Sequence, residues 1–283
     1  MEQRLREKFK DDPGMIIREI ALAAERDQDM DQETMEAVKE TVGELSRLSA
    51  AEIRDLFETV LTAKSPARGL RLAAAAGVMP FVLGEECYPP QSRHEIDSFQ
   101  TLVENYDRVR PEAEYRWALL FLCFDDKRAE QAVSRLHFDQ DRHFKFTSAL
   151  RKTQELYFIV RPFDFKKFLY VNGRENYEYW ENVTKQQCKV YDHPDNRIMS
   201  RYYMLKEFAE YKMAVWPEDL AVDRDDLLAA GIPEKKADYI LEKLLYMVHY
   251  KPRLNTRKDL LSAAKRAAAN PFSKYLRDVH FFR

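Results

Sequence analysis

Glycine is scarce in this 283-residue sequence, and long apolar runs are missing from it. Seven glycines leave little scope for the tight turns that join β-strands. The longest apolar runs, at 72–83 and 117–124, fall well short of the roughly 20 residues that a transmembrane helix needs. The composition, with 45% apolar and 33% charged residues, suits helices throughout. We therefore expect an all-α protein without a membrane-spanning segment.

Cysteine is also rare, and a secretory leader is not recognisable. The three cysteines, Cys87, Cys123 and Cys188, lie far apart and lack the spacing of metal ligands. An odd number at such distances predicts buried thiols rather than a disulfide framework. The N-terminus shows no basic segment followed by an apolar core. We expect a cytoplasmic protein.

An overall excess of positive charge is missing as well, since the formal net charge is −2. This excludes a general nucleic-acid binder that works through net charge alone. The distribution is uneven, however, because residues 251–283 carry nine Lys and Arg against two Asp. A basic end on an acidic body fits phosphate binding, although basic helices are also often only solvated. Both interpretations stay open on charge alone.

The stretch 45–83 contains the signals of two packed helices. Ser49 with Glu52 three residues later forms a predicted capping box before an apolar-periodic segment. Ser65 and Pro66 open a second helix, with proline at its first position. Gly77 supplies the C-terminal stop.

The same stretch resembles the segment after the catalytic head in bacterial CCA-adding tRNA nucleotidyltransferases and their poly(A) polymerase relatives. The matching residues are Leu48, Ser49, Glu52, Ile53, Leu56, Gly69, Leu70, Leu72, Gly77 and Val78. The resemblance implies an elongated, curved all-α chain with a neck at 1–84, a body at 85–200 and a tail at 201–283. It also implies that the catalytic head, with its triphosphate-binding loop and its Mg²⁺-binding carboxylates, precedes the matched region. We therefore expect no catalytic residue, no metal and no cofactor.

The N-terminal junction resembles the family's "E-D-x-x-R" loop, whose acid and arginine hydrogen-bond the incoming CTP or ATP base. Asp11 and Asp12 stand at the acidic positions, and Met15 stands at the arginine position. Methionine offers no hydrogen-bond donor, whereas arginine presents a fixed fork of donors. The resemblance therefore implies a degenerate nucleotide-reading loop.

A degenerate HD-hydrolase signature follows in the body. His94 fits the family's first histidine, but Gln100 stands where the second belongs. Asp125 fits the aspartate of the "H-D" pair, but Phe124 replaces its histidine. An HD metal site needs imidazoles and carboxylates that converge on one ion. The resemblance implies a helical core without a metal site, in which Trp117 belongs to an aromatic core stripe.

The C-terminal part resembles the tail that holds the tRNA elbow in the family. Three glycine positions of the tail phrase carry Arg224, Glu234 and Asp238, and the two carboxylates there disfavour phosphate. We interpret the polar stretch 193–199 as a hinge and predict a helix at 205–216. The candidate RNA-binding residues are Arg253, Arg257, Lys258, Lys265, Arg266 and Lys274.

Three functional hypotheses follow, and the first is preferred. The first is a non-catalytic protein that binds tRNA or another structured RNA. The second is a helical protein-interaction scaffold that has lost RNA binding. The third is one chain of a split CCA-adding nucleotidyltransferase, whose head is a separate polypeptide.

Overall fold

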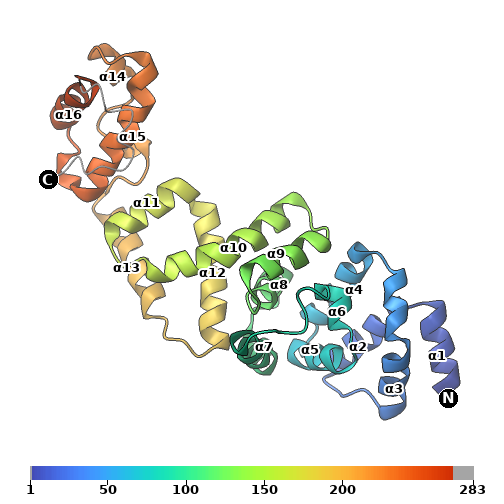
Figure 1. Ribbon diagram of the computed structural model, residues 1–283. Coiled ribbons are helices and arrows are strands. Elements are labelled where there is room, and N and C mark those ends of the chain that lie inside the picture. The colour runs from blue at the N-terminus through green and yellow to red at the C-terminus, as the bar shows by residue number, and fades with distance from the viewer. Residues whose placement is uncertain (1, 270–283) are drawn as a thin grey trace. The chain divides into compact units, whose positions relative to one another are not determined.

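The computed structural model describes residues 2–269, which form α-helices and 3₁₀ turns and contain no β-strand (Figure 1). The expected all-α fold is therefore confirmed for this part of the chain. Within 2–269, no helix combines the length and the apolar character that a membrane crossing requires. The described residues divide into two compact units, a first unit of residues 2–158 and Glu178–Asp195 and a second unit of Ile159–Tyr177 and residues 196–269.

The helices of the first unit are α1 (Glu2–Asp11), α2 (Gly14–Arg26), α3 (Gln32–Thr41), α4 (Ala50–Thr62), α5 (Pro66–Ala75), α6 (Met79–Leu83), α7 (Arg93–Asn105), α8 (Ala113–Phe121), α9 (Asp126–Arg135) and α10 (Gln140–Phe158). Its 3₁₀ turns are η1 (Val42–Arg47) and η2 (Tyr106–Arg108). The helix α12 (Arg174–Val190) starts in the second unit and continues into the first. The second unit also holds α11 (Pro162–Asn172), α13 (Asn196–Glu210), η3 (Pro217–Asp219), α14 (Arg224–Ala229), α15 (Glu234–Tyr250), η4 (Pro252–Leu254) and α16 (Arg257–Ala269).

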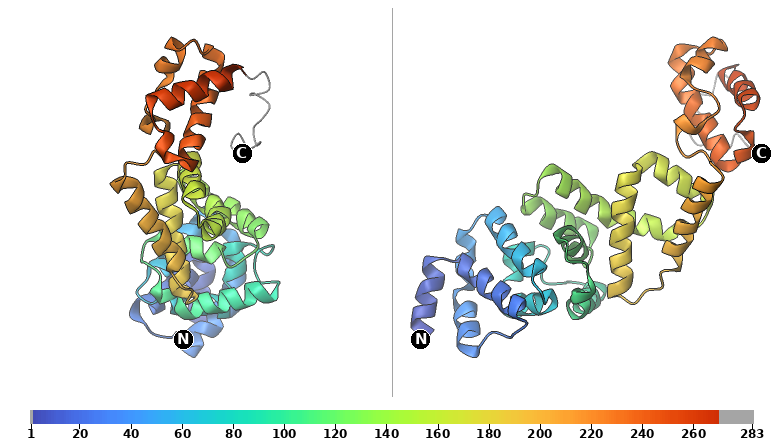
Figure 2. Two further views of the ribbon diagram at one scale, coloured as in Figure 1. Left: turned by 90° about the vertical axis from the view of Figure 1, so that its left-hand side faces the viewer. Right: turned by 180° about the vertical axis from the view of Figure 1, so that it is seen from behind.

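The N-terminal helices are built as the sequence predicts. The Ser49 hydroxyl accepts the backbone N–H of Glu52, whose carboxylate in turn accepts the backbone N–H of Ser49 at 2.8 Å, so the capping box is present. Gly77 has a φ of 78°, which favours glycine at the end of α5. The helix α2 packs against both α4 and α5 (Figure 2). At Gly69 a Cβ atom would lie 2.6 Å from the Val60 side chain, so glycine permits the close approach of α4 and α5.

An aromatic cluster forms the core around α8. Trp117 and Phe121 are fully buried and stack with their ring centroids 5.5 Å apart. Phe138 and Phe146 pack edge to face at 4.8 Å beside them. The indole N–H of Trp117 donates to the Glu58 carboxylate at 2.8 Å, so its polar edge is satisfied. The predicted core role of this stripe is confirmed.

The boundaries predicted around the hinge are wrong. The helix α13 spans Asn196–Glu210, so it begins within the predicted hinge at 193–199 and covers only the first half of the predicted helix at 205–216. Lys212 adopts a left-handed φ of 47°, and the N–H of Met213 bonds the carbonyl of Phe208. The helix therefore ends by a local C-terminal turn rather than at Pro217.

A lysine is buried in the second unit. Lys166 on α11 is 1% exposed, and its Nζ lies 3.4 Å from the Met213 sulfur and 4.7 Å from the ring centroid of Phe208. Burial lowers the pKa of this ammonium group, while the field of Glu207 opposes the shift. A thioether and an aromatic face compensate only part of the lost hydration of the charge.

Replacing Lys166 by methionine should therefore stabilise the second unit by at least about 1 kcal/mol, because an uncharged chain of similar volume removes a buried charge. Urea denaturation followed by circular dichroism measures the change. Lys167→Met is the matched control, since Lys167 is exposed and should shift stability by less than about 0.5 kcal/mol. A Lys166→Met variant less stable than the parent would contradict this account.

Candidate nucleic-acid interface

Three of the predicted RNA-binding side chains lie on the solvent-exposed side of α16. Lys265 and Arg266 follow Lys258 by seven and eight residues, which is about two helical turns. All three residues are exposed, whereas Leu260 and Ala264 on the opposite side are fully buried in the core of the second unit. Burial of the apolar stripe thus fixes which way the basic side chains face.

The remaining predicted residues differ in how free their charges are. Arg257 pairs with Asp226 on α14 at 2.5 Å, and this guanidinium lowers the pKa of Asp226. Arg253 is exposed in η4. Arg266 donates to the Ser262 hydroxyl at 3.1 Å, which leaves its charge unneutralised by that contact. Lys274 lies outside the described residues.

Asn255 holds the basic helix in place. Its side-chain amide donates to the carbonyl of Asp219 at 2.8 Å and accepts the N–H of Ala221 at the same distance. These two bonds tie the segment before α16 to the segment before α14. Gly231, with a φ of 85°, supplies the turn between α14 and α15.

The residues at the three glycine positions of the tail form one ion-pair cluster. Arg224 donates to Asp238 at 3.0 Å and to Glu234 at 3.2 Å. Both carboxylates raise the pKa of the guanidinium. The repulsion expected from two lone carboxylates is therefore partly neutralised. Sequence spacing alone gave no sign that Arg224 reaches both.

The N-terminal loop contains an aspartate–arginine pair that the sequence comparison missed. The Asp12 carboxylate accepts the N–H of Gly14 at 3.1 Å and pairs with Arg18 at 2.7 Å. Asp11 is exposed at the end of α1, and Met15 is half-buried at the start of α2. Arg18 lies about one helical turn beyond Met15. Because Asp12 and Arg18 pair with each other, the ion pair stabilises the loop, and neither charged group is left without a partner.

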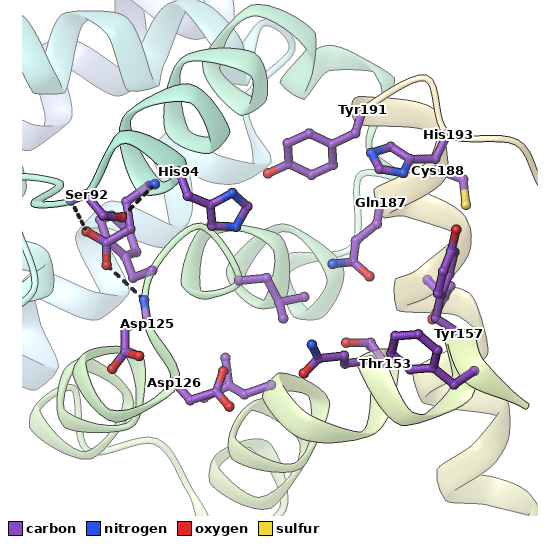
Figure 3. Close-up of a pocket in the computed structure, with 17 residues that line it drawn as sticks. Ser92, His94, Asp125, Asp126, Thr153, Tyr157, Gln187, Cys188, Tyr191 and His193 are labelled. Carbon is purple, nitrogen blue, oxygen red and sulfur yellow. Dashed lines mark hydrogen bonds between the residues drawn. The ribbon is translucent and has the colours of Figure 1, made fainter.

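His94 and Asp125 line one cavity of about 710 Å³ within the first unit (Figure 3). Its walls come from the start of α7, the start of α9, the last turns of α10 and the end of α12. Phe124 also lines it, whereas Gln100 is exposed elsewhere on α7 and does not. The predicted pair is thus brought together by the fold. Within residues 2–269, no three histidine, cysteine, aspartate or glutamate side chains are arranged to hold a metal ion.

A buried carboxylate at the edge of this cavity was also missed. Glu95 accepts the backbone N–H groups of Gln91, Ser92 and Asp125 and pairs with Arg128 at 2.6 Å. Burial acts to raise the pKa of Glu95, but the N–H groups of Asp125 and Gln91, together with Arg128, outweigh it and hold the pKa at about 2. The capping-box spacing of Ser92 and Glu95 is the sequence signal that identifies this residue.

The helical arrangement described above is the fold of a region of the CCA-adding enzymes. The Thermotoga maritima CCA-adding enzyme complexed with tRNA_CCA is 18% identical, with a TM-score of 0.54 over 92% of this chain and 62% of that chain. A CCA-adding enzyme in complex with ATP is 20% identical, with a TM-score of 0.55 over 89% of this chain and 59% of that one. An apo CCA-adding enzyme gives a TM-score of 0.57 over 94% of this chain and 62% of that one, at 18% identity.

The chain therefore spans about three fifths of the length of these enzymes. At this level of identity the likeness establishes the fold alone. The resemblance inferred from the sequence is therefore confirmed as a shared fold. No protein-family model and no curated protein sequence matches the chain.

Proposed function

We propose that this chain is a non-catalytic protein that binds folded tRNA or another structured RNA. The likeness to a CCA-adding enzyme complexed with tRNA, over 92% of this chain, is the observation that carries the proposal. In this proposal the regions 1–84, 85–200 and 201–283 correspond to a neck, a body and a tail, and the tail holds the RNA.

The exposed face of α16 supplies the charge for such binding. Lys258, Lys265 and Arg266 point away from the core and are available to phosphate oxygens. Side chains of a helix placed on double-stranded RNA meet mostly phosphates and 2′-hydroxyls, so recognition follows shape rather than sequence. Arg253 and Arg257 extend the basic side chains to the start of the helix.

Replacing Lys258, Lys265 and Arg266 together by glutamate should abolish binding of total tRNA in a filter-binding titration. Each phosphate contact releases counterions and contributes about 0.7–0.9 to the log–log salt slope. If three contacts exist, a fourfold rise in salt should weaken binding of the parent by roughly tenfold or more. The salt slope of the parent therefore reports how many of these side chains meet phosphate.

The matched control reverses the charges of Lys8 and Lys10, two exposed cations of the first unit, and should change the affinity little.

Labelled CTP and ATP supplied with Mg²⁺ to the same preparation should not be incorporated into tRNA that lacks its 3′ end. Robust incorporation would contradict the non-catalytic assignment. Absence of tRNA binding at low salt, or indifference to the triple change, would favour the protein-interaction scaffold.

A further inference from the structure

The cavity beside His94 has an unusual charge balance that RNA binding by α16 does not use. No lysine or arginine is among the described residues that line it. Its carboxylates are Glu95, Asp125 and Asp126. A wall with carboxylates and no cation repels phosphate and carboxylate ligands and attracts positive charge.

The two sides of the cavity differ in chemistry. Asp125 and Asp126 lie at the start of α9 on one side (Figure 3). Tyr157 and Tyr191 lie on the opposite side, and Gln187 points inward from α12. A ligand that spans the cavity therefore meets carboxylates at one end and flat aromatic and amide surfaces at the other.

Three neighbouring groups that would favour an anion are already engaged. The Asp125 side chain accepts the N–H of Lys127 at 3.1 Å, which uses one of the donors at the N-terminus of α9. Arg128 is held by the Glu95 carboxylate, and Arg151 pairs with Glu130. The Asp126 carboxyl lies beside Asp125, and burial together with this second carboxyl raises the pKa of Asp126.

We propose that this cavity binds a small organic amine whose ammonium group lies at Asp125 and Asp126 and whose flat portion packs against Tyr157 and Tyr191. The volume of about 710 Å³ lies within the range typical of small-molecule sites. Paired carboxylates supply charge-assisted hydrogen bonds to an ammonium group. The amides of Gln154 and Gln187 offer donors and acceptors for polar substituents on the flat portion.

Two probes of similar shape and opposite charge test the assignment. Phenethylamine and 3-phenylpropionate are titrated into the full chain by calorimetry at about pH 8, where an unperturbed imidazole is neutral. Phenethylamine should bind at least about tenfold more tightly, and Asp125→Asn with Asp126→Asn should remove the preference. Asparagine also caps helices well, so α9 should stay intact.

The control variant carries Asp97→Asn with Asp141→Asn, which changes the net charge equally at two exposed residues outside the cavity. It should keep the preference for the amine. Equal or tighter binding of 3-phenylpropionate would overturn the proposal. Failure of phenethylamine to bind at millimolar concentration would overturn it too.

Cys188 gives an independent measurement of the charge inside the cavity. It is half-buried in the cavity wall, whereas Cys87 and Cys123 are buried, and burial raises the pKa of each of these two thiols to about 12. A cationic methanethiosulfonate should therefore label Cys188 at least about threefold faster than an anionic one, once intrinsic rates are normalised to a small thiol. Cys188→Ser provides the background.

The rate ratio should fall towards one in the variant with Asp125→Asn and Asp126→Asn, and phenethylamine should slow the labelling of the parent. A ratio that survives the two substitutions would overturn the role of these carboxylates. Labelling that is indifferent to phenethylamine would overturn the position of the ligand.

Discussion

Replacement of Glu95 by alanine should lower the free energy of unfolding of the first unit by roughly 3–5 kcal/mol. Glu95 is 4% exposed, and its carboxylate accepts backbone N–H groups of Gln91, Ser92 and Asp125. Its loss leaves these backbone donors and Nη1 of Arg128, whose side chain is 14% exposed, without their acceptor. The other guanidinium nitrogens keep backbone carbonyls, but the positive charge loses its carboxylate partner. A buried cation without its partner costs far more than the pair contributes. Urea denaturation near neutral pH measures the loss.

The control for Glu95 lies on the same helix. Asp97 pairs with Arg93 at 2.9 Å, but both side chains are largely exposed, so Asp97→Ala should change stability by less than about 1 kcal/mol. The pH dependence has a definite sign. In the folded protein the pKa of Glu95 is about 2, below its ordinary value of 4.5. Its contribution to the free energy of unfolding is therefore complete above pH 4.5 and is lost as the pH falls towards 2. An alanine variant as stable as the Asp97 control would refute this account.

The first unit could be predicted well because its helix ends are encoded locally. Ser49 with Glu52 and Pro66 with Gly77 determine caps within a few residues of sequence, and the structure has them as predicted. The core position of Trp117 and Phe121 could also be predicted, because residues four apart lie on the same side of a helix. The structure buries α8 on all sides from Arg116 to Phe121, which that spacing does not predict.

The boundary of α13 could not be predicted in the same way. Pro217 prevents a preceding helix from continuing through it, but it does not determine how far before it that helix ends. The buried positions Ile198, Met204 and Phe208 extend the helix towards Asn196 at the expense of polar residues that favour a hinge. Tertiary burial therefore overrode the local polarity.

Charge partners were the hardest part of the candidate sites to predict. Arg18 reaches Asp12, and Arg224 reaches both Glu234 and Asp238, through turns whose geometry the sequence does not specify. Each pair changes the interpretation of a residue that had been judged by its own charge alone. Which groups of the tail and of the cavity are available to a ligand is therefore known only from the structure.

Lowering the pH from 7 to 5 should destabilise the second unit by about 2 kcal/mol through His249 alone. This side chain is 3% exposed, its Nε2–H donates to the carbonyl of Val215 at 3.0 Å, and its Nδ1 has no partner within the described residues. Burial and the positive charge of Lys166 together lower the pKa of His249 to about 4, and they outweigh the Val215 hydrogen bond and Asp219, which favour protonation. The folded unit therefore resists protonation of this ring.

The sign of the effect follows from the two pKa values of His249. In the unfolded chain the ring titrates near 6.5, so between 6.5 and 4 the unfolded state binds more protons than the folded state. The contribution of His249 to the free energy of unfolding is complete above about pH 6.5 and is lost as the pH falls from 6.5 to 4. The contribution of Glu95 to the stability of the first unit is lost only below pH 4.5. As the pH falls, the second unit should therefore lose stability before the first.

Amide hydrogen exchange read by mass spectrometry separates the two units, because peptides of α11 and α15 report the second and peptides of α7 and α9 the first. Between pH 7 and 5, after correction for intrinsic exchange rates, protection should fall in α11 and α15 and remain in α7 and α9. His249→Gln keeps a donor for Val215 but cannot titrate, so it should remove this pH dependence whatever its absolute stability. His193→Gln, at an exposed histidine, should retain it. If the loss of protection persists in His249→Gln, the acid sensitivity has another source, and the buried imidazole does not control the stability of the second unit.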